Sequence, residues 1–406
     1  MSRRVPTICL VTAEISGDQN AARLAVALRE LTPGLRLIGV GGAAMREAGI
    51  EVPVGTTDLS FIGAVASFPL LRQMLGRYRR VQELIRRTRP DLVVLIDSEF
   101  LNRHLARWLG RRGIPVVFFF PPPVWLWGRW RLRAVASLAR RVISAFRAEA
   151  ELYESAGVDT VWVGHPLRDV VEPGEDATHA LRKIGLDPAR PLVVLMPGSR
   201  RQEIAQLSPA ILGAARILKA RDPRLQFALP VASEELRGEV ERRVRESALE
   251  GVVLYRPDSY AVLSRARVVV QCSGTATMES ALLGVPAVIA YRCIPLEYFV
   301  GRYLLIHARF IGIVNILFDE MVQPEFFQKH VDAQHLAEEA WSLLTDEPRR
   351  QRMVSRLASL PELLGPPGAL DRAARAVLEL VPGVELPPLE GSPPVDAERR
   401  RRATAG

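Results

Sequence analysis

Short apolar runs alternate with amphipathic segments along most of the chain. The first series of runs is typical of buried strands and covers residues 7–13, 35–40, 91–96, 115–120 and 141–144. A second series begins after Pro166 and covers residues 192–196, 226–230, 252–255, 268–271 and 287–291. Strands that alternate with helices predict βαβ units, so the pattern indicates an α/β protein with parallel, doubly wound sheets.

Two such series predict two Rossmann-like domains that face a cleft. The 406 residues exceed the roughly 250–300 at which one hydrophobic core stops growing. We place an N-terminal domain at residues 1–166, a C-terminal domain at 167–381, and a disordered tail rich in proline and arginine at 382–406. Helical patterns at 332–345, 348–357 and 369–380 are assigned to the second domain.

Composition indicates an anionic partner without naming it. The chain is 48% hydrophobic and 24% charged, as in ordinary folded proteins, and its net charge is +9. Such a charge favours nucleic acid, phospholipid or a phosphorylated substrate. The 3 cysteines are widely spaced, which fits a reducing cytoplasm better than a disulfide framework. The longest uncharged stretch, 114–128, is shorter than the roughly 18–20 apolar residues of a membrane span.

The strongest local signal is Pro197-Gly-Ser-Arg-Arg201, which lies between a strand and a helix. Such a junction places backbone N–H groups at the positive end of a helix. Gly198 permits close approach to a ligand, Ser199 offers a hydroxyl, and Arg200 can grip a phosphate with two N–H groups. The pattern fits a phosphate site or an ordinary capped turn equally well.

A second junction of this kind is Cys272-Ser-Gly-Thr-Ala-Thr-Met-Glu279. Ser273, Gly274 and Thr275 would start another helix with free N–H groups. Glu279 follows about one helical turn later, so it can face the same ligand, and a carboxylate there suits the two hydroxyls of a ribose. The alternative is a capped core helix, with Glu279 placed by the helix dipole. Two such junctions in one domain favour ligand binding.

The first domain has candidates at the carboxyl ends of two strands, the edge where open α/β sheets bind ligands. Glu14-Ile-Ser-Gly-Asp18 follows the first strand, and its acidic and hydroxyl groups suit sugar hydroxyls. Asp97 ends the very apolar strand 92–96, and apolar walls raise the pKa of a carboxylate toward that of a general base. The alternatives are a polar turn at 14–18 and a helix cap at Asp97.

No metal site is expected. The 6 histidines lack metal-binding spacing, and no Asp-x-Asp pair follows a strand. His165 lies where the chain crosses between the two domains, and a lone histidine is more often a hydrogen-bonded structural residue. Charge on a leaving diphosphate would then be met by helix ends and Arg200.

Residues 68–89 form a candidate basic amphipathic helix. Its apolar residues include Leu71 and Met74, and Arg77 is one of several arginines beside them. Such a helix either lies on an anionic membrane or covers the sheet with its apolar face. Trp125 and Trp127, interleaved with arginines, fit an interface belt, nucleic-acid stacking or packing around a proline-rich turn.

In their order along the chain, these segments resemble the lipid-A-disaccharide synthase family, which is glycosyltransferase family 19. The resemblance runs from about Thr7 to Leu380. It rests on Ala13-Glu-Ile-Ser-Gly-Asp18, Ile96-Asp97, Pro123-Val-Trp-Leu-Trp127, Gly164-His165, Pro197-Gly-Ser-Arg200, Ser273-Gly-Thr-Ala276 with Glu279, Tyr291-Arg292, Asn315 and Pro324-Glu-Phe-Phe-Gln328. No single motif is diagnostic, but the ordered set is specific.

The resemblance implies a GT-B fold whose N-terminal domain binds the acceptor and whose C-terminal domain binds a UDP-sugar. The implied reaction joins UDP-2,3-diacylglucosamine to 2,3-diacylglucosamine 1-phosphate and releases UDP, in lipid A and lipopolysaccharide biosynthesis. It is an inverting, metal-independent displacement by a peripheral protein on the cytoplasmic face of the inner membrane. No cofactor and no specific nucleic acid are implied, and the oligomeric state, a homodimer included, stays open.

The resemblance also assigns roles to individual residues. Asp97 becomes the general base on the acceptor hydroxyl, with Glu14 and Arg200 in the same catalytic set. The donor site is expected to contain Ser199, Arg200, Ser273, Gly274, Thr275, Glu279, Asn315 and Gln328. Contacts with the acceptor or the membrane are expected from Ser16, Asp18, Leu71, Met74, Arg77, Trp125 and Trp127.

The chain departs from the family pattern on the acceptor side. Ala13 replaces a glycine, Pro123 replaces a serine, and Phe100 stands where a second acidic residue is frequent. Two other functions fit the residues. One is a related UDP-N-acetylglucosamine enzyme, either a transferase with another lipid acceptor or a 2-epimerase. The other is a catalytically silent, membrane-bound protein that binds a nucleotide sugar.

Overall fold

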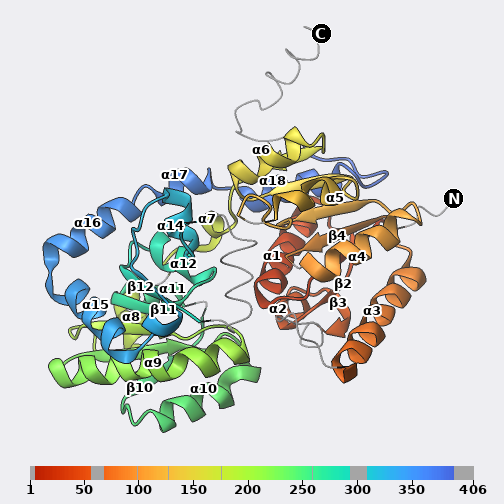
Figure 1. Ribbon diagram of the computed structural model, residues 1–406. Coiled ribbons are helices and arrows are strands. Elements are labelled where there is room, and N and C mark those ends of the chain that lie inside the picture. Colours follow the sequence, from red (N-terminus) through yellow and green to blue (C-terminus); the bar gives the residue numbers. More distant parts are fainter. Residues whose placement is uncertain are drawn as a thin grey trace, which may run out of the picture.

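Two parallel sheets, one in each half of the chain, form the framework of the molecule (Figure 1). The computed structural model describes residues 5–55, 68–97, 99–126, 128–174, 176–257, 259–292 and 309–387, without the side chains of 68–75, 77, 99 and 100. The expected tail beyond residue 387, Trp127 and the side chains of Leu71, Met74 and Arg77 therefore lie outside the described residues.

The first sheet has the strand order β3-β2-β1-β4-β5-β6-β7. Its strands are β1 (Thr7–Val11), β2 (Arg36–Gly41), β3 (Glu51–Gly55), β4 (Leu92–Ile96), β5 (Val116–Phe119), β6 (Arg141–Ser144) and β7 (Thr160–Trp162). In β1, Ile8 and Leu10 belong to one buried layer, and Cys9 and Val11 belong to the other. Because both faces are covered, the strand is a continuous apolar run.

Helices pack on both faces of this sheet. One layer contains α1 (Ile15–Leu31), α2 (Ala43–Glu47) and α18 (Ala369–Leu378). The other contains α3 (Phe68–Thr88), α4 (Glu99–Gly110), α5 (Leu132–Ala136) and α6 (Arg147–Ser155). A short 3-10 helix, Arg129–Arg131, leads into α5.

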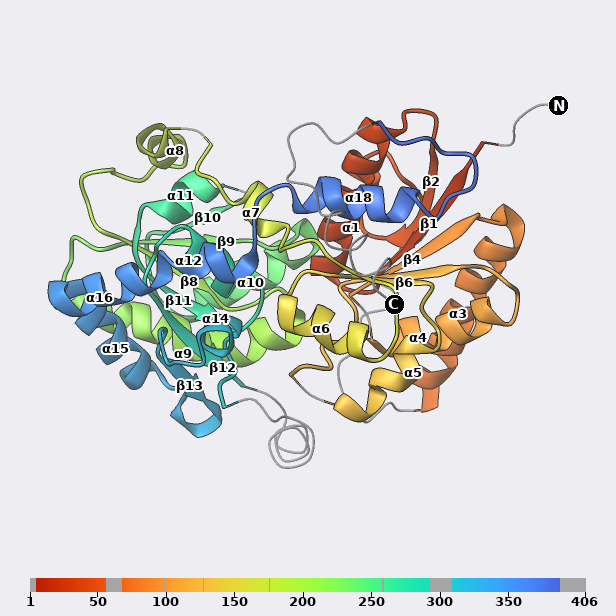
Figure 2. The ribbon, with the colours of Figure 1, turned by 90° about the horizontal axis from the view of Figure 1, so that it is seen from above.

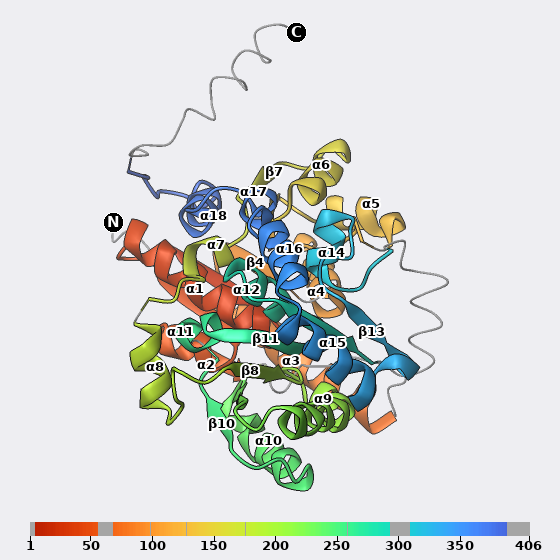
Figure 3. The same cartoon turned by 90° about the vertical axis from the view of Figure 1, so that its left-hand side faces the viewer.

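The second sheet has the strand order β10-β9-β8-β11-β12-β13. Its strands are β8 (Leu192–Met196), β9 (Gln226–Pro230), β10 (Val252–Tyr255), β11 (Ala266–Cys272), β12 (Ala287–Tyr291) and β13 (Glu325–Phe327). One layer is built from α9 (Arg201–Arg221), α10 (Glu234–Glu246), α12 (Ala276–Leu282), α14 (Ile313–Phe318), α15 (Ala333–Thr345), α16 (Glu347–Leu357) and α17 (Leu360–Leu364). The other holds α8 (Ala177–Lys183) and α11 (Tyr260–Ser264). Figure 3 shows α9, α15 and α16 on the side turned toward the viewer.

The last helix, α18, leaves the second sheet and packs against α1 of the first (Figure 2). Arg141, at the start of β6, donates to the carbonyl of Ala376 at 2.7 Å and pairs with Glu379 at 2.6 Å. From the sequence we assigned this helix to the second domain. Its packing places it in the core of the first.

The chain thus crosses between the sheets twice, and the two crossings are hydrogen-bonded to each other. The N–H of His165, just before α7 (Leu167–Val170), donates to the carbonyl of Leu364 at 2.8 Å. The carboxylate of Asp169 accepts from the N–H groups of Gly368 and Leu370 at 2.6 and 2.9 Å. The sheets are therefore joined by a double crossing.

All the predicted strands are present, with ends shifted by at most two residues. The prediction missed β3, β7 and β13, each of which lies at the edge of a sheet. These strands are short and only partly buried, so they lack the continuous apolar run by which the other strands were found.

Candidate active site

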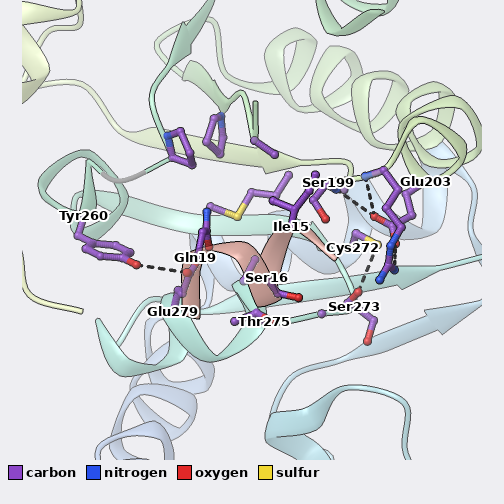
Figure 4. Close-up of a pocket in the computed structure, with 18 of the residues that line it drawn as sticks. Ile15, Ser16, Gln19, Ser199, Glu203, Tyr260, Cys272, Ser273, Thr275 and Glu279 are labelled. Atoms are coloured by element: carbon purple, nitrogen blue, oxygen red, sulfur yellow. Dashed lines mark hydrogen bonds and ion pairs between the residues drawn. The ribbon is translucent and has the colours of Figure 1, made fainter. Parts of the chain in front are cut away.

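A cavity lies between the two halves of the molecule, where polar motifs from both sheets meet (Figure 4). It is lined from the first half by Ile15, Ser16, Gln19 and Arg23. From the second half it is lined by Met196, Gly198, Ser199, Arg200, Glu203, Pro230, Ala232, Pro257, Tyr260, Cys272, Ser273, Gly274, Thr275, Ala276 and Glu279. The loops after β1, β8 and β11 lie at the points where the strand order of each sheet reverses, and the other lining residues lie at or after the ends of β9 and β10. Open α/β sheets bind ligands at such points.

The turn after β8 is built around the carboxylate of Glu203. Its Oε2 accepts from the N–H of Ser199 at 3.0 Å and from the N–H of Arg200 at 3.2 Å. Gly198 has a φ of 132°, and a Cβ there would lie 2.5 Å from the Cβ of Glu203, so this position requires glycine. The N–H groups that we expected to be free for a phosphate are therefore occupied by Glu203, a residue the motif analysis did not single out.

The guanidinium of Arg200 lies between two carboxylates from different halves of the chain. Its Nη1 pairs with Glu203 at 2.7 Å, and its Nη2 pairs with Glu14 at 2.8 Å. Burial lowers the pKa of Arg200, but the charges of Glu203 and Glu14 outweigh it and raise that pKa above its ordinary value. An ionised guanidinium thus faces the cavity, with Nη1 and Nη2 each paired to a carboxylate of a different half of the chain.

The loop after β11 brings four expected donor-site residues to the same cavity: Ser273, Gly274, Thr275 and Glu279. The hydroxyl of Tyr260 donates to Oε1 of Glu279 at 3.2 Å. Burial raises the pKa of Glu279, whereas the charge of Arg23 and the bond from Tyr260 lower it. Neither Tyr260 nor Arg23 belongs to a motif that the sequence singled out.

Asp97 follows directly after β4, as expected, and has a φ of 43°, which aspartate tolerates better than most residues. The hydroxyl of Ser16 donates to its Oδ2 at 2.6 Å. Burial raises the pKa of Asp97 to about 6; the Ser16 hydrogen bond lowers it, the charge of Glu14 raises it, and Arg200 lowers it. A carboxylate with this pKa is ionised at neutral pH and is still basic enough to take a proton.

Comparisons with known proteins identify the family. The sequence model of the lipid-A-disaccharide synthetase family matches residues 8–366. The chain belongs to this family. Lipid-A-disaccharide synthases of Geobacter metallireducens and Syntrophus aciditrophicus are 38% and 36% identical to it over 374 residues, which is 92% of this chain and 97% of each relative.

Solved structures show the same fold at low identity. UDP-GlcNAc 2-epimerase from Neisseria meningitidis, bound to UDP-GlcNAc, superposes with a TM-score of 0.61 at 12% identity, covering 93% of this chain and 99% of that one. A putative UDP-N-acetylglucosamine 2-epimerase from Listeria monocytogenes gives a TM-score of 0.58 at 14% identity, covering 92% and 96%. The fold is therefore GT-B, as the family resemblance implied.

Asp18, in the family's first motif, does not face the cavity. It is 6% exposed, and its carboxylate accepts from the N–H groups of Gly42, Ala44 and Met45 at 2.5, 2.9 and 3.4 Å. The structure therefore corrects the expected acceptor contact. The hydrogen bonds of Asp18 hold the start of α2 against α1, so Asp18 stabilises the fold.

Replacing Asp18 with alanine is expected to lower the free energy of unfolding by roughly 2–4 kcal/mol, because buried N–H donors would lose their acceptor. Denaturant titration measures this loss. Glu47→Ala removes an exposed carboxylate from the same helix α2 and should leave stability unchanged. Wild-type stability together with a raised KM for the acceptor would restore the sequence-based assignment.

Two expected donor-site residues, Asn315 and Gln328, are not among the described residues that line the cavity. Asn315 is fully buried. Its Nδ2 donates to the carbonyl of Gln323 at 2.7 Å and to Glu325 at 3.1 Å, and its Oδ1 accepts from the N–H of Gln323 at 2.8 Å. Asn315 thus fixes the chain next to β13. Gln328 begins a short 3-10 helix, Gln328–His330, with a φ of 50°.

On the acceptor side, the part of α3 whose side chains are described packs on the sheet. Val81 and Ile85 are fully buried, whereas Arg86 and Arg87 are exposed. The ring of Trp125 lies 5.3 Å from that of Phe146, and its buried Nε1 has no hydrogen-bond partner among the described residues. Among the described helices, none is both long and apolar enough to cross a membrane.

A further buried carboxyl, Glu149, lies near the base. It is 2% exposed in the first turn of α6 and accepts a hydrogen bond from the hydroxyl of Ser144 at 2.7 Å. Burial raises the pKa of Glu149 to about 8. The hydrogen bond from Ser144 lowers this pKa, and the charge of Asp97 raises it. Glu149 is therefore mostly protonated at neutral pH. No local motif marks it, because its burial comes from tertiary packing.

His165 is a structural residue of the double crossing. It is 3% exposed, its Nδ1 accepts from the N–H of Leu167 at 3.1 Å, and its ring packs against Phe120 and Phe146. Burial lowers the pKa of His165 to about 3, so the ring is neutral. Within the described ranges, no cluster of three His, Cys, Asp or Glu side chains could hold a metal ion.

Proposed function

We propose that this chain transfers diacylglucosamine from UDP-2,3-diacylglucosamine to 2,3-diacylglucosamine 1-phosphate, which yields UDP and the β-1,6-linked disaccharide phosphate. Family membership supports this substrate pair. The observation that carries the mechanism is a pair of contacts beside the cavity: Ser16, which lines it, donates to Asp97, and Arg200, which also lines it, pairs with Glu14. Asp97 and Glu14 themselves are not among the described residues that line the cavity. A base from one half of the molecule and a cation from the other fit a transfer between two bound substrates.

In the proposed mechanism, Asp97 takes the proton of the acceptor hydroxyl as its oxygen attacks C1 of the donor sugar. The bond from C1 to the diphosphate oxygen breaks, and UDP leaves with the bonding electrons. Arg200 and the hydroxyl of Ser199 meet the charge that develops on the diphosphate. The diphosphate replaces Glu14 on Nη2 of Arg200, while Glu203 keeps Nη1 in place.

Glu279 is proposed to accept hydrogen bonds from the ribose hydroxyls, and Ser273, Gly274 and Thr275 to line the diphosphate. Because Arg200 supplies a positive charge at this place, we expect the reaction to proceed without a divalent ion. The acceptor would enter along the first half of the molecule, where Ser16 donates to Asp97.

We also propose that the protein works as a peripheral protein on the cytoplasmic face of the inner membrane. Both substrates would carry acyl chains, and the exposed arginines of α3, such as Arg86 and Arg87, suit an anionic surface. The positive net charge of +9 points the same way.

The test is a UDP-release assay with purified protein, both lipid substrates, detergent and EDTA. We expect UDP and disaccharide phosphate in equal amounts, no UDP when the acceptor is omitted, and no effect of EDTA. Three results would contradict the proposal: UDP release without acceptor, epimerisation of UDP-N-acetylglucosamine, and UDP binding without any turnover. The second would indicate a 2-epimerase, and the third a silent binder.

A further inference from the structure

One face of α1 lines the donor cavity, although α1 belongs to the first sheet. Ser16, Gln19 and Arg23 follow one another at spacings of three and four residues, so they lie on the same side of the helix, and all three line the cavity. In Figure 4, Gln19 lies beside the side chains of Tyr260 and Glu279, and Ser16 lies nearer Thr275. The donor site is therefore bounded on one side by the half of the molecule expected to bind the acceptor.

Arg23 meets a polar pair from the second sheet across this cavity. Tyr260, at the start of α11, donates to Glu279 in α12 at 3.2 Å. Arg23 lines the same cavity as Tyr260 and Glu279, and its charge acts on both of them. Side chains from α1, α11 and α12 thus meet at this cavity.

The charge of Arg23 favours the ionised form of Glu279. Burial raises the pKa of Glu279. Among the described residues, the charge of Arg23 and the hydrogen bond from Tyr260 lower it. Tyr255 lies close enough to be influenced by Glu279, but it is a neutral phenol. The charge of Arg23 also lowers the pKa of His165, whose ring is neutral. Arg23 is therefore the one positive charge that acts on Glu279 within the described chain.

We propose that Arg23 is a positioning residue of the donor site, which closes α1 over the nucleotide by holding Tyr260 and Glu279 from the opposite side of the cavity. The inference rests on the proposed function, in which Glu279 binds the ribose. An ionised carboxylate can accept hydrogen bonds from both ribose hydroxyls with its two oxygens. In a protonated carboxyl, one of the two oxygens carries the proton and is a poorer acceptor. Donor affinity then depends on a residue of the acceptor half.

The test is calorimetric titration of UDP into the full-length protein at pH 8 and pH 6. We compare the wild type with Arg23→Met and Arg23→Lys, and with Arg46→Met, which removes an exposed arginine from α2 of the same half. Arg23→Met should weaken UDP binding by about tenfold at pH 8. The loss should be larger at pH 6, because Glu279 without Arg23 takes up a proton more readily. Arg23→Lys should restore most of the affinity, and Arg46→Met should bind as the wild type does.

Steady-state kinetics provide a second readout. Arg23→Met should raise KM for the UDP-sugar and leave kcat and the KM for the acceptor unchanged, a split that general damage to the fold would not produce. Arg23→Gln serves as a second neutral variant if the methionine variant does not fold.

The outcomes separate this inference from the proposed function. A wild type that does not bind UDP would contradict the proposed function. A wild type that binds UDP, with Arg23→Met binding equally well, would overturn the role of Arg23 alone. An equal loss of UDP affinity at both pH values that Arg23→Lys does not restore would also overturn the role of Arg23. Such a result would mean that the positive charge of Arg23 does not affect UDP binding.

Discussion

Asp97→Asn is expected to lower kcat by about 10²–10⁴-fold, the usual contribution of a general base. Asparagine keeps the shape of the side chain, can still accept the hydrogen bond from Ser16, and tolerates the left-handed backbone at this position. What it loses is the ability to take a proton. Steady-state rates with both lipid substrates measure the effect, and KM for the donor should hardly change.

The pH dependence follows from the pKa of about 6 at Asp97. The wild-type rate should rise as pH increases through 6, because the ionised form is the active base. Since folding raises this pKa above its ordinary value, the ionised carboxylate costs stability at higher pH. Asp97→Asn should therefore be more stable than the wild type at pH 8, by roughly 3 kcal/mol at most, and equally stable below pH 4. Wild-type kcat in this variant would exclude Asp97 as the base.

Arg200→Met is expected to lower kcat/KM for the UDP-sugar by about 10²–10³-fold, as when one donor to a developing oxyanion is removed. The substitution takes the cation from between Glu14 and Glu203, so the diphosphate would meet two carboxylates and no positive charge. Arg200→Lys should fall between the wild type and methionine, because a lysine keeps the charge but not the planar fork.

Arg201→Met is the matched control. Arg201 is the next residue, is exposed, and donates to the carbonyl of Glu235 at 3.1 Å away from the cavity. Kinetics with varied donor and with varied acceptor should show the loss in Arg200→Met alone, mainly on the donor side. Equal losses in both variants would mean that the region matters only through its overall charge.

The framework of the fold could be predicted because the inner strands are buried on both faces. Runs such as Leu92–Ile96 and Leu192–Met196 are apolar throughout, so they stand out without any knowledge of their neighbours. The edge strand Glu51–Gly55 is only partly buried and contains Pro53, so it has no continuous apolar run by which a local pattern could mark it as a strand. The return of α18 to the first sheet depends on which apolar surface remains uncovered, which a local pattern does not show.

The candidate site could be predicted in place but not in all its contacts. Carboxyl ends of parallel strands gather at one edge, so Asp97, Ser199 and Thr275 could be expected at the cleft. Motif membership did not distinguish a residue that faces the cavity from one that holds the backbone. Asp18 and Asn315 belong to the family pattern, yet both are bound to backbone groups nearby.

The residues that the sequence analysis missed act through tertiary contacts. Glu203 fills the turn that we expected to be free, because it lies one helical turn beyond Ser199 and reaches back to it. Arg23 lies on α1 of the first half and Tyr260 on α11 of the second, and only the packing of the two halves brings them to one cavity. Nothing in their own segments distinguishes them from surface residues.

The stereochemistry of the product tests the central claim most directly. The wild type would be incubated with the α-linked UDP-sugar, the lipid acceptor and EDTA, and the product would be examined by mass spectrometry and NMR. The account predicts a disaccharide 1-phosphate with a new β-1,6 bond, because a single displacement with Asp97 as base inverts the donor carbon. An α-linked product, or a sugar released to water with the acceptor unchanged, would contradict it.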